Sequence, residues 1–134
     1  MDQDKLNRLP PDVKKQFVKL ALKLSEKKKK SQVHDDFLSF VKHVWPEFIE
    51  GPHHKKIAEK FNRLAKGEVK RLIINMPPRH TKSEFASFLL PSWMVGRKPD
   101  LKIIQTTHTT ELAIRFGRKA KTLMDSPEYK QVFD

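Results

Sequence analysis

The chain has 134 residues, of which 28 are Lys or Arg and 16 are Asp or Glu, so its net charge is +12 and its length suits one modest domain. No apolar run is long enough to cross a bilayer, the polar, acid-containing start does not resemble a signal peptide, and the lack of Cys excludes disulfides and thiolate metal sites. The positive charge predicts a polyanionic partner, and nucleic acid is the natural candidate.

The N-terminal segment, residues 1–32, holds much of this charge. Residues 1–11 predict a loosely held start, and residues 12–30 have the period of an amphipathic basic helix. Packing of the apolar face on the rest of the protein is the favoured use, with DNA binding and assembly as alternatives. The run of four Lys at 27–30 is equally compatible with a solvated helix end and with phosphate contacts. The apolar positions are Val13, Phe17, Leu20, Ala21 and Leu24.

Two further helices are predicted before residue 70. The first follows Asp35 and Asp36, which favour a helix N-terminus, and it ends at Trp45, which precedes a proline. The second contains regularly spaced apolar residues over 57–65 and ends at Gly67, a residue type common just after a helix.

An adjacent pair of histidines, His53 and His54, stands at the start of this second helix. Neighbouring residues are expected to point to different faces, and no Cys or acidic partner has matching spacing. The pair is therefore interpreted as a helix-start or adenine-side packing feature and not as a metal site.

A short apolar strand is predicted at residues 70–75, and it leads into a polar loop that ends in Lys82 and Ser83. This is the layout of a phosphate-binding loop, in which backbone N–H groups point inward, a Lys reaches the β- and γ-phosphates, and the neighbouring hydroxyl binds Mg²⁺. A helix that begins near Lys82 adds the positive end of its dipole. The competing interpretation is a strand, loop and helix with an incidental Lys-Ser pair.

The loop departs from the pattern G-x-x-x-x-G-K-[ST] at both glycine positions, which are occupied by Met76 and Thr81. Glycine is preferred there because the loop can need a positive φ and a close approach of the backbone to phosphate, and a β-branched Thr suits neither. The loop therefore either follows a different path or is strained.

The remaining sequence predicts a helix that Pro91 should kink or end, a second strand over 101–106, and a last helix over about 109–124 that a Thr at its start would cap. The order strand, helix, strand, helix implies a right-handed crossover in a mainly parallel sheet. The predicted fold class is α/β: a P-loop NTPase-like partial parallel sheet with flanking helices over residues 33–134, preceded by the helical N-terminal segment.

The run Asn-Met-Pro-Pro-Arg-His-Thr-Lys-Ser-Glu at 75–84 resembles the Walker A segment of tailed-bacteriophage terminase large subunits, which often reads Pro-Pro-Arg-His-Gly-Lys-Ser. The resemblance extends over about residues 35–134. It implies the N-terminal, ATP-binding part of a motor that packages double-stranded viral DNA into the procapsid in the host cell cytoplasm. It further implies ATP and Mg²⁺ as cofactors, and a terminase small subunit, a portal protein and a homo-oligomeric ring as partners. Other segments in the family's order begin at Gly51, Leu90, Gly96, Glu111, Phe116 and Ser126.

Within the loop, the resemblance implies catalytic roles for Arg79, as a γ-phosphate sensor or arginine finger, and for Lys82. Lys82 would cradle the β- and γ-phosphates, and Ser83 would bind Mg²⁺ that arrives with the nucleotide. His80 is expected to shape the loop, and Glu84 to point away from the metal. The residues predicted to contact the nucleotide are Pro78, Arg79, His80, Thr81, Lys82, Ser83 and Glu84.

A Walker B motif and an acidic nuclease cluster are both missing from the sequence. The chain is therefore expected to be the N-terminal part of an ATPase and to hydrolyse ATP negligibly by itself. Two other functions stay open. One is another DNA-directed P-loop ATPase, such as a helicase, and the other is a basic DNA-binding or assembly fragment with a degenerate nucleotide loop.

Overall fold

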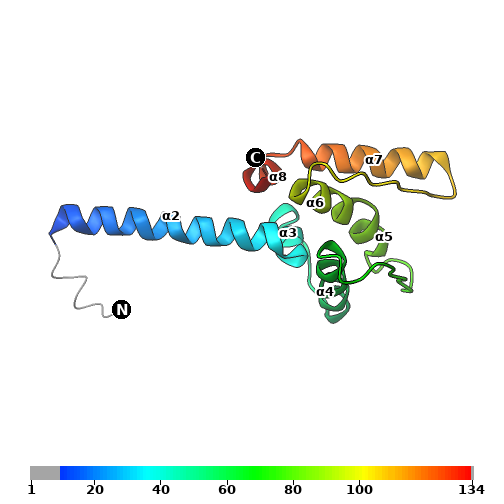
Figure 1. The fold of residues 1–134 in the computed structure, drawn as a ribbon, viewed down its shortest axis with the longest axis horizontal. Coiled ribbons are helices and arrows are strands. Elements are labelled where there is room, and N and C mark those ends of the chain that lie inside the picture. The colour runs from blue at the N-terminus through cyan, green and yellow to red at the C-terminus, as the bar shows by residue number, and fades with distance from the viewer. Residues whose placement is uncertain (1–9, 134) are drawn as a thin grey trace. The chain divides into compact units, whose positions relative to one another are not determined.

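The structure is a computed structural model that describes residues 10–133 (Figure 1). The chain divides into two compact units, Met1–Ser31 and Gln32–Asp134, and each is described by itself. Most of the predicted loosely held start, residues 1–9, lies outside the described residues.

The first unit is built on one long helix, α2 (Pro11–Asp35), whose last residues belong to the second unit. Residues 12–30 are rich in Lys and Leu, which form helices readily. The predicted helix is confirmed, but its end lies five residues beyond Lys30. Its large apolar side chains are exposed within this unit, with Leu20 55% and Leu24 59% accessible. None of the helices in residues 10–133 is long and apolar enough to span a bilayer.

The core of the second unit is aromatic and centres on Phe37, which is fully buried. Phe37 begins α3 (Phe37–Val44), and its ring meets those of Phe61, Phe85 and Trp93 edge to face at 5.1, 5.4 and 5.5 Å between centroids. Phe61 comes from α4 (Pro52–Ala65), which ends before Gly67 with its φ of 78°. Both predicted helices in this region are therefore confirmed.

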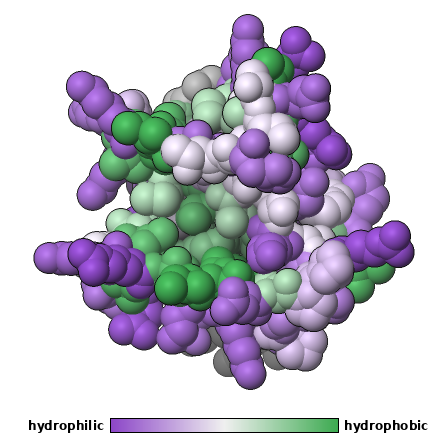
Figure 2. Space-filling view, turned by 90° about the vertical axis from the view of Figure 1, so that its right-hand side faces the viewer, coloured by the Kyte–Doolittle hydropathy of each residue, from purple (hydrophilic) through white to green (hydrophobic). Residues whose placement is uncertain are grey.

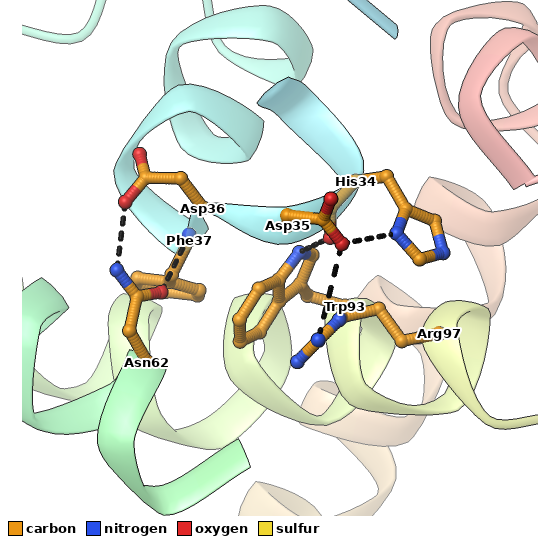
Figure 3. Close-up of polar contacts among 7 residues, drawn as sticks. All are labelled: His34, Asp35, Asp36, Phe37, Asn62, Trp93 and Arg97. Atoms are coloured by element: carbon orange, nitrogen blue, oxygen red, sulfur yellow. Dashed lines mark hydrogen bonds and ion pairs between the residues drawn. The ribbon is translucent and has the colours of Figure 1, made fainter. Parts of the chain in front are cut away.

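Polar contacts fix the start of α3 against its neighbours (Figure 3). The Asp36 carboxylate caps the helix by accepting the Ser39 N–H at 2.8 Å, and its other oxygen accepts from the Asn62 amide at 2.7 Å. The Asn62 side-chain oxygen in turn accepts the Phe37 N–H at 2.8 Å. The Trp93 indole N–H donates to the His34 carbonyl at 3.0 Å, so α2, α3, α4 and the Trp93 helix are joined at this point within the second unit.

One helical run of three parts extends from residue 82 to 97: α5 (Lys82–Glu84), the π-helical η1 (Phe85–Leu89) and α6 (Leu90–Arg97). The change of register comes directly before Pro91, which has no N–H to give to an α-helical bond. The run therefore changes its hydrogen-bond pattern at the predicted place and continues instead of ending there.

The C-terminal part consists of α7 (Thr110–Met124) and α8 (Pro127–Phe133). Thr109 caps α7 by accepting the Leu112 N–H, which confirms capping by a Thr at this start. The short α8 was not predicted. Its Tyr129 hydroxyl donates to the buried Ser92 carbonyl at 2.8 Å and ties α8 to α6.

The predicted α/β fold is wrong: 68% of the structure is helical, and residues 10–133 contain no strand and no sheet. Both segments predicted as strands, 70–75 and 101–106, are irregular. Their Ile residues favour extended backbone, but a strand also needs a neighbouring strand to pair with, and in residues 10–133 neither segment pairs with one. Ile73 and Ile104 are consequently 86% and 91% exposed. Figure 2 shows apolar side chains reaching the surface around a hollow bordered by hydrophilic ones.

Candidate phosphate-binding site

The loop that carries the predicted site connects the irregular segment 70–77 to α5. Arg79 and His80 are exposed at its tip, while Thr81 and Lys82 are half-buried where the helix begins. Arg79 and Thr81 have φ angles of 65° and 56°, and they are the only non-glycine residues with positive φ among those described. Thr81 thus adopts the left-handed conformation that glycine would take at this position, which costs energy for a β-branched residue. Of the two alternatives for Thr81, a different path or strain, the structure has the strained one.

A buried histidine of α4 holds Thr81 in this conformation. The His54 side chain is 6% exposed, and its Nε2 lies 2.7 Å from the Thr81 hydroxyl oxygen. Its Nδ1 accepts the Gly51 N–H at 2.9 Å, which satisfies a donor at the start of α4. The helix-start role inferred for the histidine pair therefore holds for His54. The expectation that the two rings point to different faces is wrong, because their centroids are 3.8 Å apart.

The surroundings of His54 favour the neutral form of its imidazole. Burial lowers the pKa of His54 below its ordinary value of 6.5, and the neighbouring His53 and His80 lower it further. Glu50 acts in the opposite direction but is itself engaged in ion pairs with Lys42 and Lys55. A neutral ring with one N–H and one bare nitrogen is the form that fits both hydrogen bonds.

The groups that could bind an anion are unused. Among residues 10–133, no hydrogen bond or ion pair joins the side chain of Arg79, Lys82 or Ser83 to another residue. The first backbone N–H groups of the helical run that begins at Lys82 also lack a side-chain cap, because the Thr81 hydroxyl donates to the His80 carbonyl instead. Two cations, a hydroxyl and several N–H donors are therefore available within five consecutive residues.

Glu84 is separated from this group by an ion pair. The Lys119 ammonium of α7 lies 2.8 Å from both Glu84 carboxylate oxygens. The Glu84 carboxylate is thereby bound to α7. The sequence predicted that Glu84 would point away from the metal, and this contact is consistent with that prediction. Pro78 is exposed, and its carbonyl oxygen lies 2.9 Å from His80 Nδ1. The loop tip is therefore stabilised by a contact between the His80 side chain and the loop backbone.

A cavity of about 340 Å³ adjoins the loop on the side of α4. Its walls are partly apolar and its α4 edge is basic, which suits an uncharged ring next to an anionic group. Residues 10–133 contain no cluster of three or more His, Asp or Glu able to hold a metal ion. The cavity is lined by His53, Lys56, Ile57, Lys60 and residues 72–76.

Two contacts that shape the site were not predicted. His54 and Thr81 are 27 residues apart, and Glu84 and Lys119 are 35 apart. No local pattern in the sequence signals either pair. The only available hint was Thr81 itself, whose unsuitability for positive φ implies that something else in the fold must hold it.

Comparisons of the chain with protein-family models, with curated proteins and with solved structures find no match.

Proposed function

We propose that residues 78–84 bind the phosphate groups of ATP together with Mg²⁺. The observation that carries this proposal is the set of unused donors at Arg79, Lys82, Ser83 and the start of the helical run, on a backbone held in a strained conformation. Strain is maintained only where surrounding structure enforces it, and such positions concentrate at ligand-binding sites. Donors left unpaired at a helix start attract phosphate groups.

The roles within the site follow from the chemistry of each group. Lys82 would neutralise the β- and γ-phosphates, Arg79 would approach the γ-phosphate from the loop tip, and the Ser83 hydroxyl would contact Mg²⁺ brought by the nucleotide. The base and ribose would lie in the cavity beside His53. The sequence has no Walker B motif to help hold Mg²⁺ and the attacking water, so this chain alone should bind ATP without hydrolysing it at a useful rate.

We further propose that the chain is the N-terminal part of a terminase large subunit, the ATP-driven motor that packages double-stranded DNA into a procapsid. The support is the order of the sequence motifs around the loop, together with the high positive charge. The all-helical fold adds no support. The small subunit, the portal protein and a ring of copies are the partners that this role would require.

A second function, DNA binding by α2, is favoured by one observation. Residues 11–31 contain eight Lys against two acidic residues, and nearly all the described side chains of this segment are exposed. A cationic helix of this kind releases counterions when it contacts DNA phosphates, so its affinity should fall steeply as salt is raised.

The test of the phosphate site is a titration of the full chain with a fluorescent ATP analogue and Mg²⁺. Saturable binding should be lost in Lys82→Ala and retained in Lys66→Ala, which removes an equal charge at the opposite end of α4 from His54. ATP and ADP should displace the fluorescent analogue better than AMP does, because the proposed site contacts the β-phosphate. Equal losses in the two variants would show that only overall charge attracts the nucleotide and would refute the site.

A further inference from the structure

We propose that His54 is a positioning residue for the phosphate loop: the hydrogen bond from its Nε2–H to Thr81 allows a threonine to take the place of a glycine. The effect on nucleotide affinity rests on the proposed function. The hydrogen bond itself can be measured without nucleotide.

The hydrogen-bond partners assign every proton in this chain of contacts. The Gly51 N–H donates to His54 Nδ1, so Nδ1 carries no proton and the neutral ring is protonated at Nε2. Nε2–H then donates to the Thr81 hydroxyl oxygen at 2.7 Å. The Thr81 hydroxyl donates its own proton to the His80 carbonyl, also at 2.7 Å. Each donor has one acceptor, and the sequence of bonds runs from the start of α4 into the loop.

The position of the imidazole is fixed by the aromatic core. The His54 ring packs against Phe48 at 4.7 Å and against Phe85 at 5.1 Å between centroids. Phe85 is 1% exposed and contacts Phe37 at the centre of the core. Thr81, whose positive φ is unfavourable for a β-branched residue, is therefore connected through His54 to the buried aromatic core of the second unit.

The Thr81 side chain supplies a hydrogen-bond acceptor that a glycine lacks. A glycine would adopt the left-handed conformation without assistance, but it would leave the buried Nε2–H without its acceptor. The hydroxyl also turns away from the N–H groups of the helical run, because it is occupied by His54 and His80. The contact thus holds the backbone and keeps the helix start open for phosphate.

Two substitutions separate the two hydrogen bonds of His54. An Asn side chain can present an acceptor near the place of Nδ1 and retain the bond from Gly51, but it is too short to reach Thr81. A Gln side chain can place an N–H near the place of Nε2 and retain the bond to Thr81. His54→Asn should therefore damage the loop while sparing the start of α4, and His54→Gln should do the reverse.

The nucleotide experiment is a cycle of variants titrated with the fluorescent ATP analogue and Mg²⁺. In the parent chain, His54→Asn should weaken binding about tenfold, the effect of losing one buried hydrogen bond, and His54→Gln should restore most of it. In the Thr81→Gly chain, His54→Asn should change affinity less than about twofold, because glycine needs no support. Equal weakening in both backgrounds would overturn the proposal.

The ligand-free experiment decides the matter even if the parent binds no nucleotide, an outcome that would refute the proposed function alone. Long-range ¹H–¹⁵N spectra of the imidazole should show the His54 proton on Nε2 and slow exchange with water. Thr81→Val removes the acceptor and should make that exchange faster, while the melting temperature reports whether the fold is kept. A proton on Nδ1, or exchange that Thr81→Val leaves unchanged in a folded chain, would overturn the proposal.

Discussion

Two helix starts in this molecule have similar local sequences and different structures. Thr81 precedes α5, and Thr109 precedes α7, and each follows an irregular segment that contains a pair of isoleucines. Thr109 has an extended backbone with φ of −136°, and its hydroxyl accepts the Leu112 N–H of its own helix. Thr81 has φ of 56°, and its hydroxyl makes no such bond.

The difference comes from a partner that is distant in the sequence. His54 occupies the Thr81 hydroxyl, whereas the Thr109 hydroxyl accepts from its own helix and the nearby Thr107 hydroxyl donates to the Thr109 carbonyl at 2.7 Å. One helix start is thus closed by its own cap, and the other is left open. The comparison teaches that residue type at the N-cap does not decide whether a helix start can bind a ligand, because tertiary contacts can redirect the capping side chain.

The largest effect should come from the ring that supports His54. Phe85→Ala should lower the free energy of unfolding by about 3–5 kcal/mol, because it empties a buried aromatic position. Ile104→Ala, in the segment before α7, should change it by less than about 0.5 kcal/mol, because that side chain is 91% exposed. Urea denaturation of the two variants measures both values. Similar losses in the two variants would mean that the two segments are equally anchored.

Removing the two hydroxyls should have unequal consequences. Thr81→Ala should lower the free energy of unfolding by about 1–3 kcal/mol, because it leaves the buried His54 N–H without an acceptor. Denaturation at neutral pH measures this loss. The loss should be smaller in the His54→Asn chain, whose side chain is too short to reach Thr81, and an unchanged loss would contradict the pairing.

The matching substitution at the other helix start acts through capping alone. Thr109→Ala should cost about 1 kcal/mol, the usual loss of an N-cap side chain. Thr109→Asn should recover most of this stability, since Asn also caps helix starts well. Amide exchange at Leu112 reports the cap directly, and unchanged protection in Thr109→Ala would contradict a capping role.

The smallest expected effect is a dependence of stability on pH. The pKa of His54 is lowered in the folded chain from 6.5, chiefly by burial, so between 6.5 and the lower value the unfolded chain binds a proton that the folded chain does not. The free energy of unfolding should therefore fall as the pH is lowered from 6.5 through this window, and it should level off above 6.5. His54→Gln should reduce this slope relative to the parent. Equal slopes would mean that His54 titrates normally.

The sequence predicted the helices at 37–44, 52–65 and 110–124, because apolar period, capping residues and stop residues agree there. It did not predict the fold class, because the isoleucines near Ile73 and Ile104 favour extended backbone without supplying a partner for it. The helix α8 was missed although Ser126 and a following proline are typical of a helix start.

For the site, the sequence indicated that Thr81 is poorly suited to a positive φ. It could not show whether the loop avoids that conformation or adopts it with strain. The choice between a different path and strain depends on His54, which comes from another helix. The assignments of Arg79, Lys82 and Ser83 to ATP and Mg²⁺ remain predictions.

The most direct measurement is to follow backbone amide resonances of the full chain while MgATP is added. An open, phosphate-binding helix start predicts the largest shifts at Lys82, Ser83 and Glu84, with the amides of the capped helix start at Thr110 to Leu112 unchanged. Shifts confined to the Lys residues of α2, or spread equally over both helix starts, would contradict the account.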